Sequence, residues 1–234
     1  MPKFIFAIPL ALGVICLATA AVADDWVAQK LRGEAFVFEH GGWVQLKRGD
    51  IVANSSAIRT MKDSQIEFVR DHETIDLGAD TQIRIFDRPG QRYTTVKEAM
   101  GTVRVEANVE NVQHFSIQTP FIAATVKGTI FTVVSGKSAA HVSVQRGKVR
   151  VDDLHLGLHV DVRAGQNASA GRREGLRIAG AGKLALVMNA DGRPVGDASN
   201  KKHYNDNKNG NGDGNGKAKG KDNGDGNGKG NGKN

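Results

Sequence analysis

The sequence predicts an all-β domain of short antiparallel strands, arranged as a sandwich or a short solenoid. Apolar and polar side chains alternate with a period of two, and valine, isoleucine and phenylalanine supply most of the apolar positions. Turn signals such as HGG at 40–42 and RPGQ at 88–91 separate the alternating segments. Only TVKEAM at 95–100 favours a helical turn. The alternating segments are EAFVFE, WVQLK, QIEFV, TIDLG, QIRIF, TVRVEANV, FSIQ, TIFTVV, HVSVQ, KVRV and HVDVR.

Glycine opens three alternating stretches, GEAFVFE from Gly33, GTVRVE from Gly101 and GKVRVD from Gly147, and each stretch ends on an acidic residue. A glycine at a strand entrance lets the chain turn sharply, so its recurrence favours repeated β-units stacked on a common core. Glycine also precedes strands by chance in all-β proteins, and that alternative stays open.

The first 23 residues have the pattern of a secretory signal peptide. Lys3 precedes an apolar run, and the small residues Ala21 and Ala23 flank Val22 at the expected cleavage site. We expect cleavage after Ala23 and a periplasmic or secreted mature chain. Cys16 is the only cysteine and lies in this segment, so we expect no disulfide in the mature protein.

Residues 200–234 form a low-complexity tail of glycine, asparagine and lysine, with Tyr204 as its single aromatic residue. Such a segment cannot bury enough apolar surface to offset the entropy of ordering, so we expect it to be disordered. A flexible linker is the simplest interpretation. Its lysines also suit an anionic envelope polymer, and its NGDGNG motif resembles calcium repeats that carry a periodic large apolar residue, which this tail lacks.

The tail holds much of the positive charge. Its eight lysines and four aspartates give +4 of the formal +7, which leaves about +2 for residues 24–199 once Lys3 is set aside. We therefore expect one near-neutral domain over 24–199 and no nucleic-acid partner.

Several segments resemble the FecR domain family, over about Gly33 to Gln166. They run from GDIVANSSAIRT through GTVRVE and FSIQTPFIAATVKGTIFTVV to VSVQRGKVRV and VRAGQ. The most specific element is a Thr-Pro pair followed by Val-basic-Gly-Thr-x-Phe. It consists here of Thr119, Pro120, Val126, Lys127, Gly128, Thr129 and Phe131, with lysine where the family usually has arginine.

The resemblance implies a β-rich extracytoplasmic domain without catalysis. Founding members of the family sense an outer-membrane receptor and signal through one membrane span to a cytoplasmic anti-sigma segment. This chain has a predicted signal peptide in place of the span, so we expect a free-standing, secreted form of the domain.

The Thr119–Val134 stretch has two interpretations. Pro120 lacks an N–H and suits a strand end, while Gly128 permits a bulge or a positive φ that turns Lys127 outward and leaves Phe131 in the core. The stretch is then a structural corner. The alternative is a ligand clamp that uses Lys127, Gly128 and Thr129.

Catalytic and metal sites are not expected. His155 and His159 have a helical zinc spacing but flank a turn around Gly157, although a hairpin there could bring either near Asp152 or Asp153. Asp71, Glu73, Asp76 and Asp80 are typical of a solvated face, and Ser55, Ser56 and Ser116 lack a nucleophile motif. We therefore expect no cofactor and no enzyme.

Two functions remain: an exported protein-interaction or sensing module, which the resemblance favours, or a polysaccharide-associated envelope protein. Trp26, Trp43, Phe86 and Tyr93 on one flat surface would favour sugar stacking. A buried Trp43, which its alternating neighbours favour, together with a bare sheet edge would favour a protein partner.

Overall fold

The computed structural model describes residues 25–88, 90–91, 93–108 and 113–195. The expected signal peptide and the expected tail lie outside these residues. The described residues form seventeen strands and no helix, which confirms the all-β prediction. The strands are β1 (Trp26–Arg32), β2 (Ala35–Glu39), β3 (Gly42–Gln45), β4 (Ile51–Val52), β5 (Ala57–Thr60), β6 (Gln65–Arg70), β7 (Glu73–Leu77), β8 (Gln82–Asp87), β9 (Thr94–Glu106), β10 (Phe115–Gln118), β11 (Ile122–Val126), β12 (Ile130–Ser135), β13 (Ala139–Arg146), β14 (Lys148–Asp153), β15 (His159–Arg163), β16 (Gln166–Gly171) and β17 (Arg177–Gly180).

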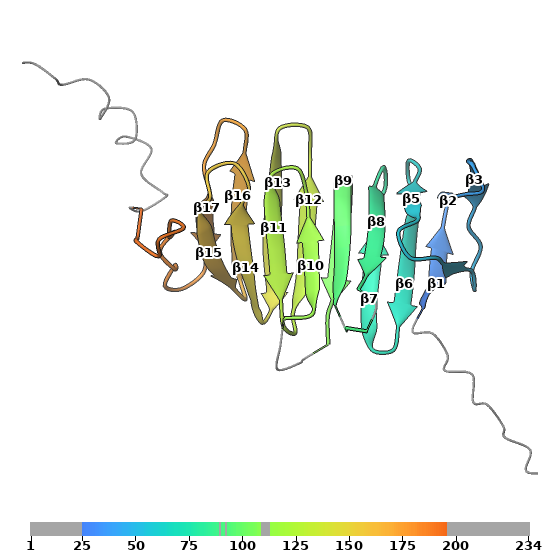
Figure 1. Cartoon of the computed structure of the whole chain (residues 1–234), viewed down its shortest axis with the longest axis horizontal. Helices are drawn as coiled ribbons and strands as arrows, with labels where there is room; N and C mark the ends of the chain where they lie inside the picture. The colour runs from blue at the N-terminus through green and yellow to red at the C-terminus, as the bar shows by residue number, and fades with distance from the viewer. Residues whose placement is uncertain (1–24, 89, 92, 109–112, 196–234) are drawn as a thin grey trace, which may run out of the picture. The chain divides into compact units, whose positions relative to one another are not determined.

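The strands form two layers that share one strand, β9. Sheet A has the order β4-β1-β6-β7-β9-β12-β13-β16-β17. Sheet B has the order β3-β2-β5-β8-β9-β10-β11-β14-β15. Strands follow one another along the domain roughly in chain order (Figure 1). Among the described strands only β9 and β10 pair in parallel, so the fold is a layered stack of antiparallel hairpins.

Strand β9 passes from one layer to the other. Its first half, Thr94–Met100, pairs with β8 in sheet B, and its second half, Gly101–Glu106, pairs with β7 and β12 in sheet A. The helical turn expected at 95–100 is therefore wrong. Val96 and Glu98 point inward and are buried while Lys97 points outward, so the period-two pattern of burial decides the conformation.

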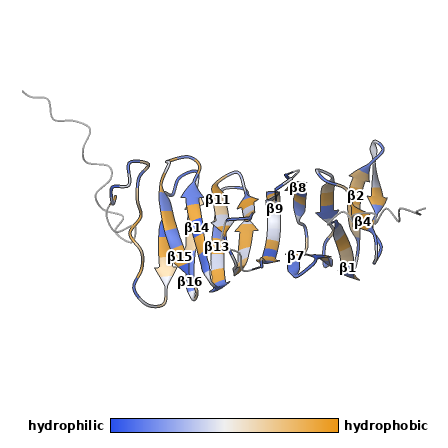
Figure 2. Cartoon of the chain, turned by 60° about the horizontal axis from the view of Figure 1, so that its bottom comes forward, coloured by the Kyte–Doolittle hydropathy of each residue, from blue (hydrophilic) through white to orange (hydrophobic). Residues whose placement is uncertain are grey.

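The core lies between the two sheets. Buried apolar residues alternate with more exposed ones along most strands, and the hydropathy colouring shows hydrophobic and hydrophilic bands along the strands (Figure 2). Large members of the core, each with under 3% of its surface exposed, are Trp26, Phe68, Phe115, Phe121, Phe131, Ile58, Ile66, Ile75 and Leu77.

The recurring glycines mark places where the chain crosses between sheets. Gly33, Gly101 and Gly147 have φ values of 73°, 115° and 84°. Gly33 joins β1 in sheet A to β2 in sheet B, Gly101 divides β9, and Gly147 joins β13 to β14. A Cβ atom at Gly101 would overlap Thr81, which belongs to the neighbouring crossing between β7 and β8. The crossings therefore stack closely on one another.

Buried hydroxyls join adjacent crossings. The Thr60 hydroxyl donates to the Gly78 carbonyl at 2.6 Å and accepts from the Thr81 N–H at 3.0 Å. The Thr81 hydroxyl in turn accepts from the Thr102 N–H at 2.9 Å. These contacts satisfy polar backbone groups that leave the sheet ladders where the chain changes layer.

The stacked crossings move to the other side of the molecule at β9. Gly101 lies opposite Ser135, whereas the other end of the same half-strand, Glu106, lies opposite Ile130. The next crossing, Lys127–Thr129, directly precedes Ile130, and a Cβ atom at Gly147 would touch the Gly128 carbonyl. The crossings at Gly33, Thr81 and Gly101 therefore lie on one side, and those at Gly128 and Gly147 lie on the other.

We predict that Gly101→Ala destabilises the domain by about 2–4 kcal/mol, because the new methyl group overlaps Thr81 and the positive φ strains alanine. Urea unfolding followed by circular dichroism measures the change. Gly41→Ala is the control, because Gly41 has a φ of 82° with nothing within 4 Å of its Cβ position. It should cost only about 1 kcal/mol. Equal losses in both variants would contradict close packing at the crossing.

Candidate functional site

The solvent-facing side of sheet B carries the candidate site, and we call it face B. Residues directly opposite one another across neighbouring strands share a face of a sheet. The strand registers therefore place one row on face B from β8 to β15. Its members are Phe86, Thr95, Ser116, Thr125, Arg150 and Asp161.

Face B has two hollows. The first has a volume of about 320 Å³ and is lined by Phe86, Asp87, Arg88, Tyr93, Thr95, Lys97 and Gln118. The second has a volume of about 460 Å³ and is lined by Gln113, Thr125, Val126, Lys127, Gly128, Thr129, Lys148, Arg150 and Asp161. Ser116 lies between them and is buried, so the two hollows are separate.

The three residues predicted as a ligand clamp line the second hollow. Lys127 is exposed and Gly128 has a φ of 154°. Thr129 is buried, and its hydroxyl donates to the Lys148 carbonyl at 3.3 Å, which joins two crossings. Lys127 is therefore the one of the three that offers a charged side chain to the hollow.

The other signature residues lie elsewhere. Thr119 and Pro120 occupy the turn between β10 and β11, where the buried Thr119 hydroxyl accepts from the N–H groups of Phe121 and Ile122 at 3.1 and 3.0 Å. Phe131 is in the core. Their contacts hold a turn and a core together, as expected of a structural corner.

Aromatic side chains gather on β2 and β3 at the far end of face B. The rings of Phe38 and Trp43 meet edge to face with centroids 5.4 Å apart. The Arg59 guanidinium lies over the Trp43 ring at 4.1 Å and over the Phe36 ring at 5.3 Å. Trp43 is half-buried on this outer surface, so its placement in the core is wrong; Trp26 is in the core. Of the four aromatic residues proposed as a sugar platform, Trp43 and Phe86 lie on face B and Tyr93 lines its first hollow.

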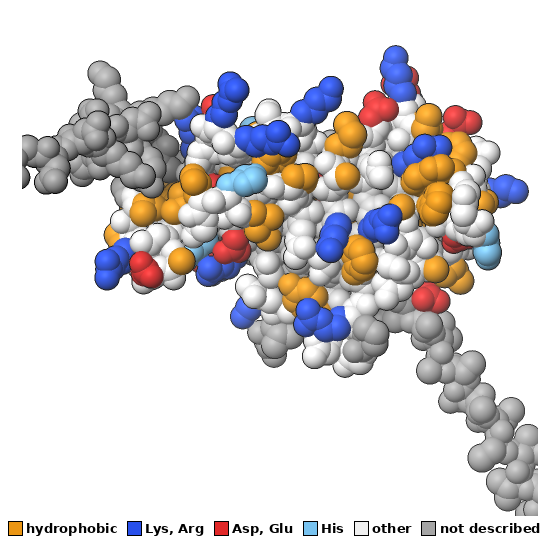
Figure 3. Space-filling model, turned by 45° about the horizontal axis from the view of Figure 1, so that its top comes forward, with side chains coloured by type: hydrophobic (Ala, Val, Ile, Leu, Met, Phe, Trp, Pro, Cys, Tyr) orange, Lys and Arg blue, Asp and Glu red, His pale blue; other side chains and the backbone are white. Residues whose placement is uncertain are grey.

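The two halves of face B differ in how their cations are neutralised. On β14 and β15, Lys148 pairs with Asp161 at 2.9 Å and Arg150 pairs with Asp152 at 3.0 Å. On β5, β8 and β9, the outward cations Arg59, Arg84 and Lys97 have no ion pair with any described residue. The Lys97 ammonium instead lies 4.9 Å from the centre of the Phe86 ring. Mixed basic and hydrophobic surfaces of this kind are visible in the space-filling view (Figure 3).

The sequence alone did not single out Arg59, Arg84 and Lys97. Each occupies a polar position in an alternating segment, AIRT, QIRIF or TVKEAM, so the pattern could predict that it points outward. Only the strand order brings the three together, because the register pairs Arg84 with Lys97 and places Arg59 on the strand beside Arg84.

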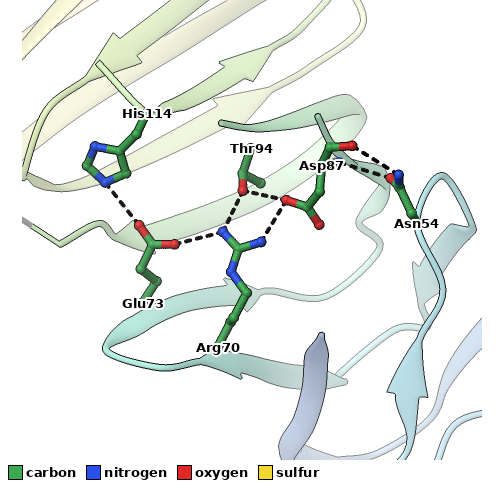
Figure 4. Close-up of polar contacts among 6 residues, drawn as sticks. All are labelled: Asn54, Arg70, Glu73, Asp87, Thr94 and His114. Atoms are coloured by element: carbon green, nitrogen blue, oxygen red, sulfur yellow. Dashed lines mark hydrogen bonds and ion pairs between the residues drawn. The ribbon is translucent and has the colours of Figure 1, made fainter. Parts of the chain in front are cut away.

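A second polar cluster, centred on Arg70, ties the two sheets together on the Glu106 side (Figure 4). The Arg70 guanidinium donates to Glu73 at 2.9 Å, to Asp87 at 2.7 Å and to the Thr94 hydroxyl at 2.6 Å. The His114 ring lies 3.0 Å from the other Glu73 oxygen. Nearby carboxylates raise the pKa of Arg70 although burial opposes this, so the cation remains charged.

The charge run between the β6–β7 turn and β8 is not a uniform solvated face. Asp71 and Asp80 are exposed in turns and have φ values of 51° and 50°. Glu73 is 8% exposed, which corrects the expectation for this residue. Asp76 lies on the outer face of sheet A, where burial and the opposing Glu67 carboxylate raise its pKa.

The histidines proposed as metal ligands lie around the β14–β15 turn. His155 is exposed and its ring lies 6.0 Å from the Phe121 ring, while His159 is on β15. Asp153 is buried and caps the turn by accepting from the N–H groups of His155 and Leu156 at 2.8 and 3.1 Å. Among the described residues, no three acidic, histidine or cysteine side chains are placed to hold a metal ion.

Glu98 is a buried carboxyl between the sheets, with 2% of its surface exposed. Neither of its oxygens has a hydrogen-bond partner among the described residues, and the nearby buried Ser135 hydroxyl also has none. Burial raises the pKa of Glu98 to about 8. The folded protein therefore holds this carboxyl in its neutral form at neutral pH.

We predict that Arg70→Met lowers the free energy of unfolding by about 3 kcal/mol or more, because it leaves Glu73 and Asp87 without their cation. Urea unfolding measures the loss. Arg146→Met is the control, since its ion pair with Glu106 is exposed and should be worth under about 0.5 kcal/mol. A loss at Arg70 no larger than the control would show that the cluster does not hold the sheets together.

We predict that Glu98→Gln stabilises the domain increasingly as pH rises from 5 to 8. The unfolded carboxyl ionises near pH 4.5 and the folded one near pH 8, so in this window rising pH favours the unfolded wild type. The gain over wild type should grow by about 1.4 kcal/mol per pH unit at most. Chemical unfolding at several pH values measures it, with the exposed Glu34→Gln as control. A gain independent of pH would contradict a buried neutral carboxyl.

In the part of the chain that the structure describes, no helix is long and apolar enough to cross a membrane.

Comparison with protein families agrees with the sequence resemblance. The FecR protein family model matches residues 56–150, from β5 to the start of β14, which includes Lys127 and the sheet B strands β5, β8, β9, β10 and β11. Two crystal structures of a "putative anti-sigma factor" from Parabacteroides distasonis ATCC 8503 match with a TM-score of 0.47 and 17% sequence identity. Each match covers 53% of this chain and 59% of the solved chain, so this protein spans about three-fifths of that relative. A comparison with curated proteins found no match. Residues 56–150 of this chain are a FecR domain.

Proposed function

We propose that the chain is an exported, non-catalytic module of the bacterial cell envelope that binds polysaccharide through face B. The observation that carries this proposal is the composition of that face. Trp43, Phe86 and Tyr93 present rings at or near it, and Gln82 and Gln118 supply amide groups between them. Rings that stack on sugar faces beside amides that bond hydroxyls make a surface suited to a sugar polymer.

The proposal of a non-catalytic role rests on how the polar clusters are used. The charges around Arg70 neutralise one another across the two sheets, and Asp153 caps a turn. Glu98 is enclosed between the sheets and lies in neither hollow of face B. Export rests on the predicted signal peptide at 1–23, and the lysine-rich tail at 200–234 adds attraction to anionic envelope polymers.

A protein partner is the second candidate, as in a sensing module of the FecR type. It would pair with the edge strands β3 and β4, which end sheets B and A. Val44 on β3 is 50% exposed and Ile51 on β4 is 59% exposed, so neither edge is protected by a charged side chain at these positions. An extended segment of another protein can add to such an edge.

Binding of the purified protein to protease-treated envelope polysaccharide from the producing cells tests the proposal. We expect binding to weaken about tenfold in Tyr93→Ala, because a stacking ring is lost. Lys127→Ala is the matched control in the second hollow and should change binding less than twofold if the sugar occupies the aromatic half of face B.

Crosslinking in the same cells tests the second candidate. Val44→Lys places a charge on the β3 edge without changing face B, and it should abolish capture of a protein that adds a strand there. If envelope polysaccharide does not bind and a stoichiometric protein is captured in a manner sensitive to Val44→Lys, the polysaccharide proposal is wrong and the protein-interaction role replaces it.

A further inference from the structure

We propose that the half of face B on β5, β8 and β9 is selective for acidic polysaccharide, with Arg59, Arg84 and Lys97 binding the carboxylate groups of the sugar chain. The inference rests on the proposed function for the location of the polymer, and it adds the chemical class of the ligand.

The first observation is a pair of like charges at directly opposite positions in the sheet. Arg84 on β8 lies directly opposite Lys97 on β9, and both point out of face B. Side chains in such pairs have Cβ atoms roughly 5 Å apart, and like charges there destabilise a sheet. No described carboxylate pairs with either residue. An anion bound between them would relieve this repulsion, because it would interact with both cations at once.

The second observation is the position of Arg59. Its guanidinium is held between the Trp43 and Phe36 rings, at 4.1 and 5.3 Å, rather than by an acid. Its Nε atom is buried and has no hydrogen-bond partner among the described residues. Arginine can donate to a carboxylate through two N–H groups at once, so the rings hold a pre-oriented guanidinium that has no acidic partner among the described residues.

The third observation is that the outward rows of this half of face B contain no acidic side chain, and Asp87, which lines the first hollow, is already paired with Arg70. The register rows from Gln45 through Phe36 and Arg59 to Gln82, and from Arg84 through Lys97 to Gln118, contain cations, amides and rings alone. Acids enter the second row only at Asp152, on β14.

Charge complementarity therefore selects between the two halves. The basic residues on β14 and β15 already have Asp152 and Asp161 as partners, so an anionic polymer gains less there. Across β3, β2, β5, β8 and β9 the unneutralised cations lie beside rings, which suits a chain that carries both sugar faces and carboxylates.

The test measures binding of the exported, purified protein to polygalacturonate, to its methyl-esterified form and to polyglutamate. The first two share a sugar backbone and differ in charge, and the third has charge without sugar rings. We expect polygalacturonate to bind at least about tenfold more tightly than either of the others, and to weaken with added salt.

Two double variants have equal changes of net charge and keep the tail. Arg84→Gln with Lys97→Gln should weaken polygalacturonate binding by roughly tenfold or more. Arg146→Gln with Arg150→Gln is the control, because both arginines already have acidic partners, and it should change binding less than about twofold. The first pair should also leave the melting temperature unchanged or raise it, since the repulsion within the sheet is removed.

Equal binding of the acidic and esterified polymers would overturn the inference and leave the proposed function standing. Equal binding of polyglutamate and polygalacturonate would overturn it too, because face B would then recognise charge without sugar. Equal losses in the two double variants would assign the binding to net charge rather than to this half of face B. Absence of binding to every sugar polymer, envelope polysaccharide included, would remove the proposed function as well.

Discussion

The close stacking of the crossings between sheets is the constraint on which the rest of this fold depends. A chain that alternates between two layers must leave the hydrogen-bonded ladder of one sheet and enter that of the other. Neighbouring crossings lie side by side. Glycine at Gly33, Gly101 and Gly147 lets the backbones approach, and buried hydroxyls such as Thr81 replace the ladder bonds that the chain gives up. The positions of these crossings set where each strand begins and ends, and which face of its sheet each side chain occupies.

The same constraint explains the most specific part of the FecR signature. Gly128 and Thr129 lie at a passage that contacts Gly147, and the Thr129 hydroxyl reaches the Lys148 carbonyl. Thr119 holds the β10–β11 turn. These signature residues support the architecture, whereas Arg59, Arg84 and Lys97 point outward from face B and take no part in these contacts.

Local pattern could predict the strands, the turns and the outward orientation of Arg84 and Lys97. It predicted the wrong conformation at 95–100 because Glu98, a polar residue at an inward position, interrupts the expected alternation. The pattern could not place Trp43, because its alternating neighbours are also typical of a core position. In the structure Trp43 lies on the outer face of the edge strand β3, with the Arg59 guanidinium over its ring. Nor could the pattern reveal the cluster around Arg70: Arg70 and Glu73 face each other within the β6–β7 hairpin, but Asp87 and His114 join them only when the two sheets are stacked.

Strand β9 gives the domain a mechanical continuity that two separately built sheets would not have. Its thirteen residues contribute hydrogen bonds to sheet B up to Met100 and to sheet A from Gly101 onward. Neither layer can peel away through this strand without pulling on the other, because both ladders are anchored to one continuous backbone. Fraying is thereby directed to the hairpins at the two ends of the stack, and the central strands β8, β9 and β10 remain the last part of the domain to open.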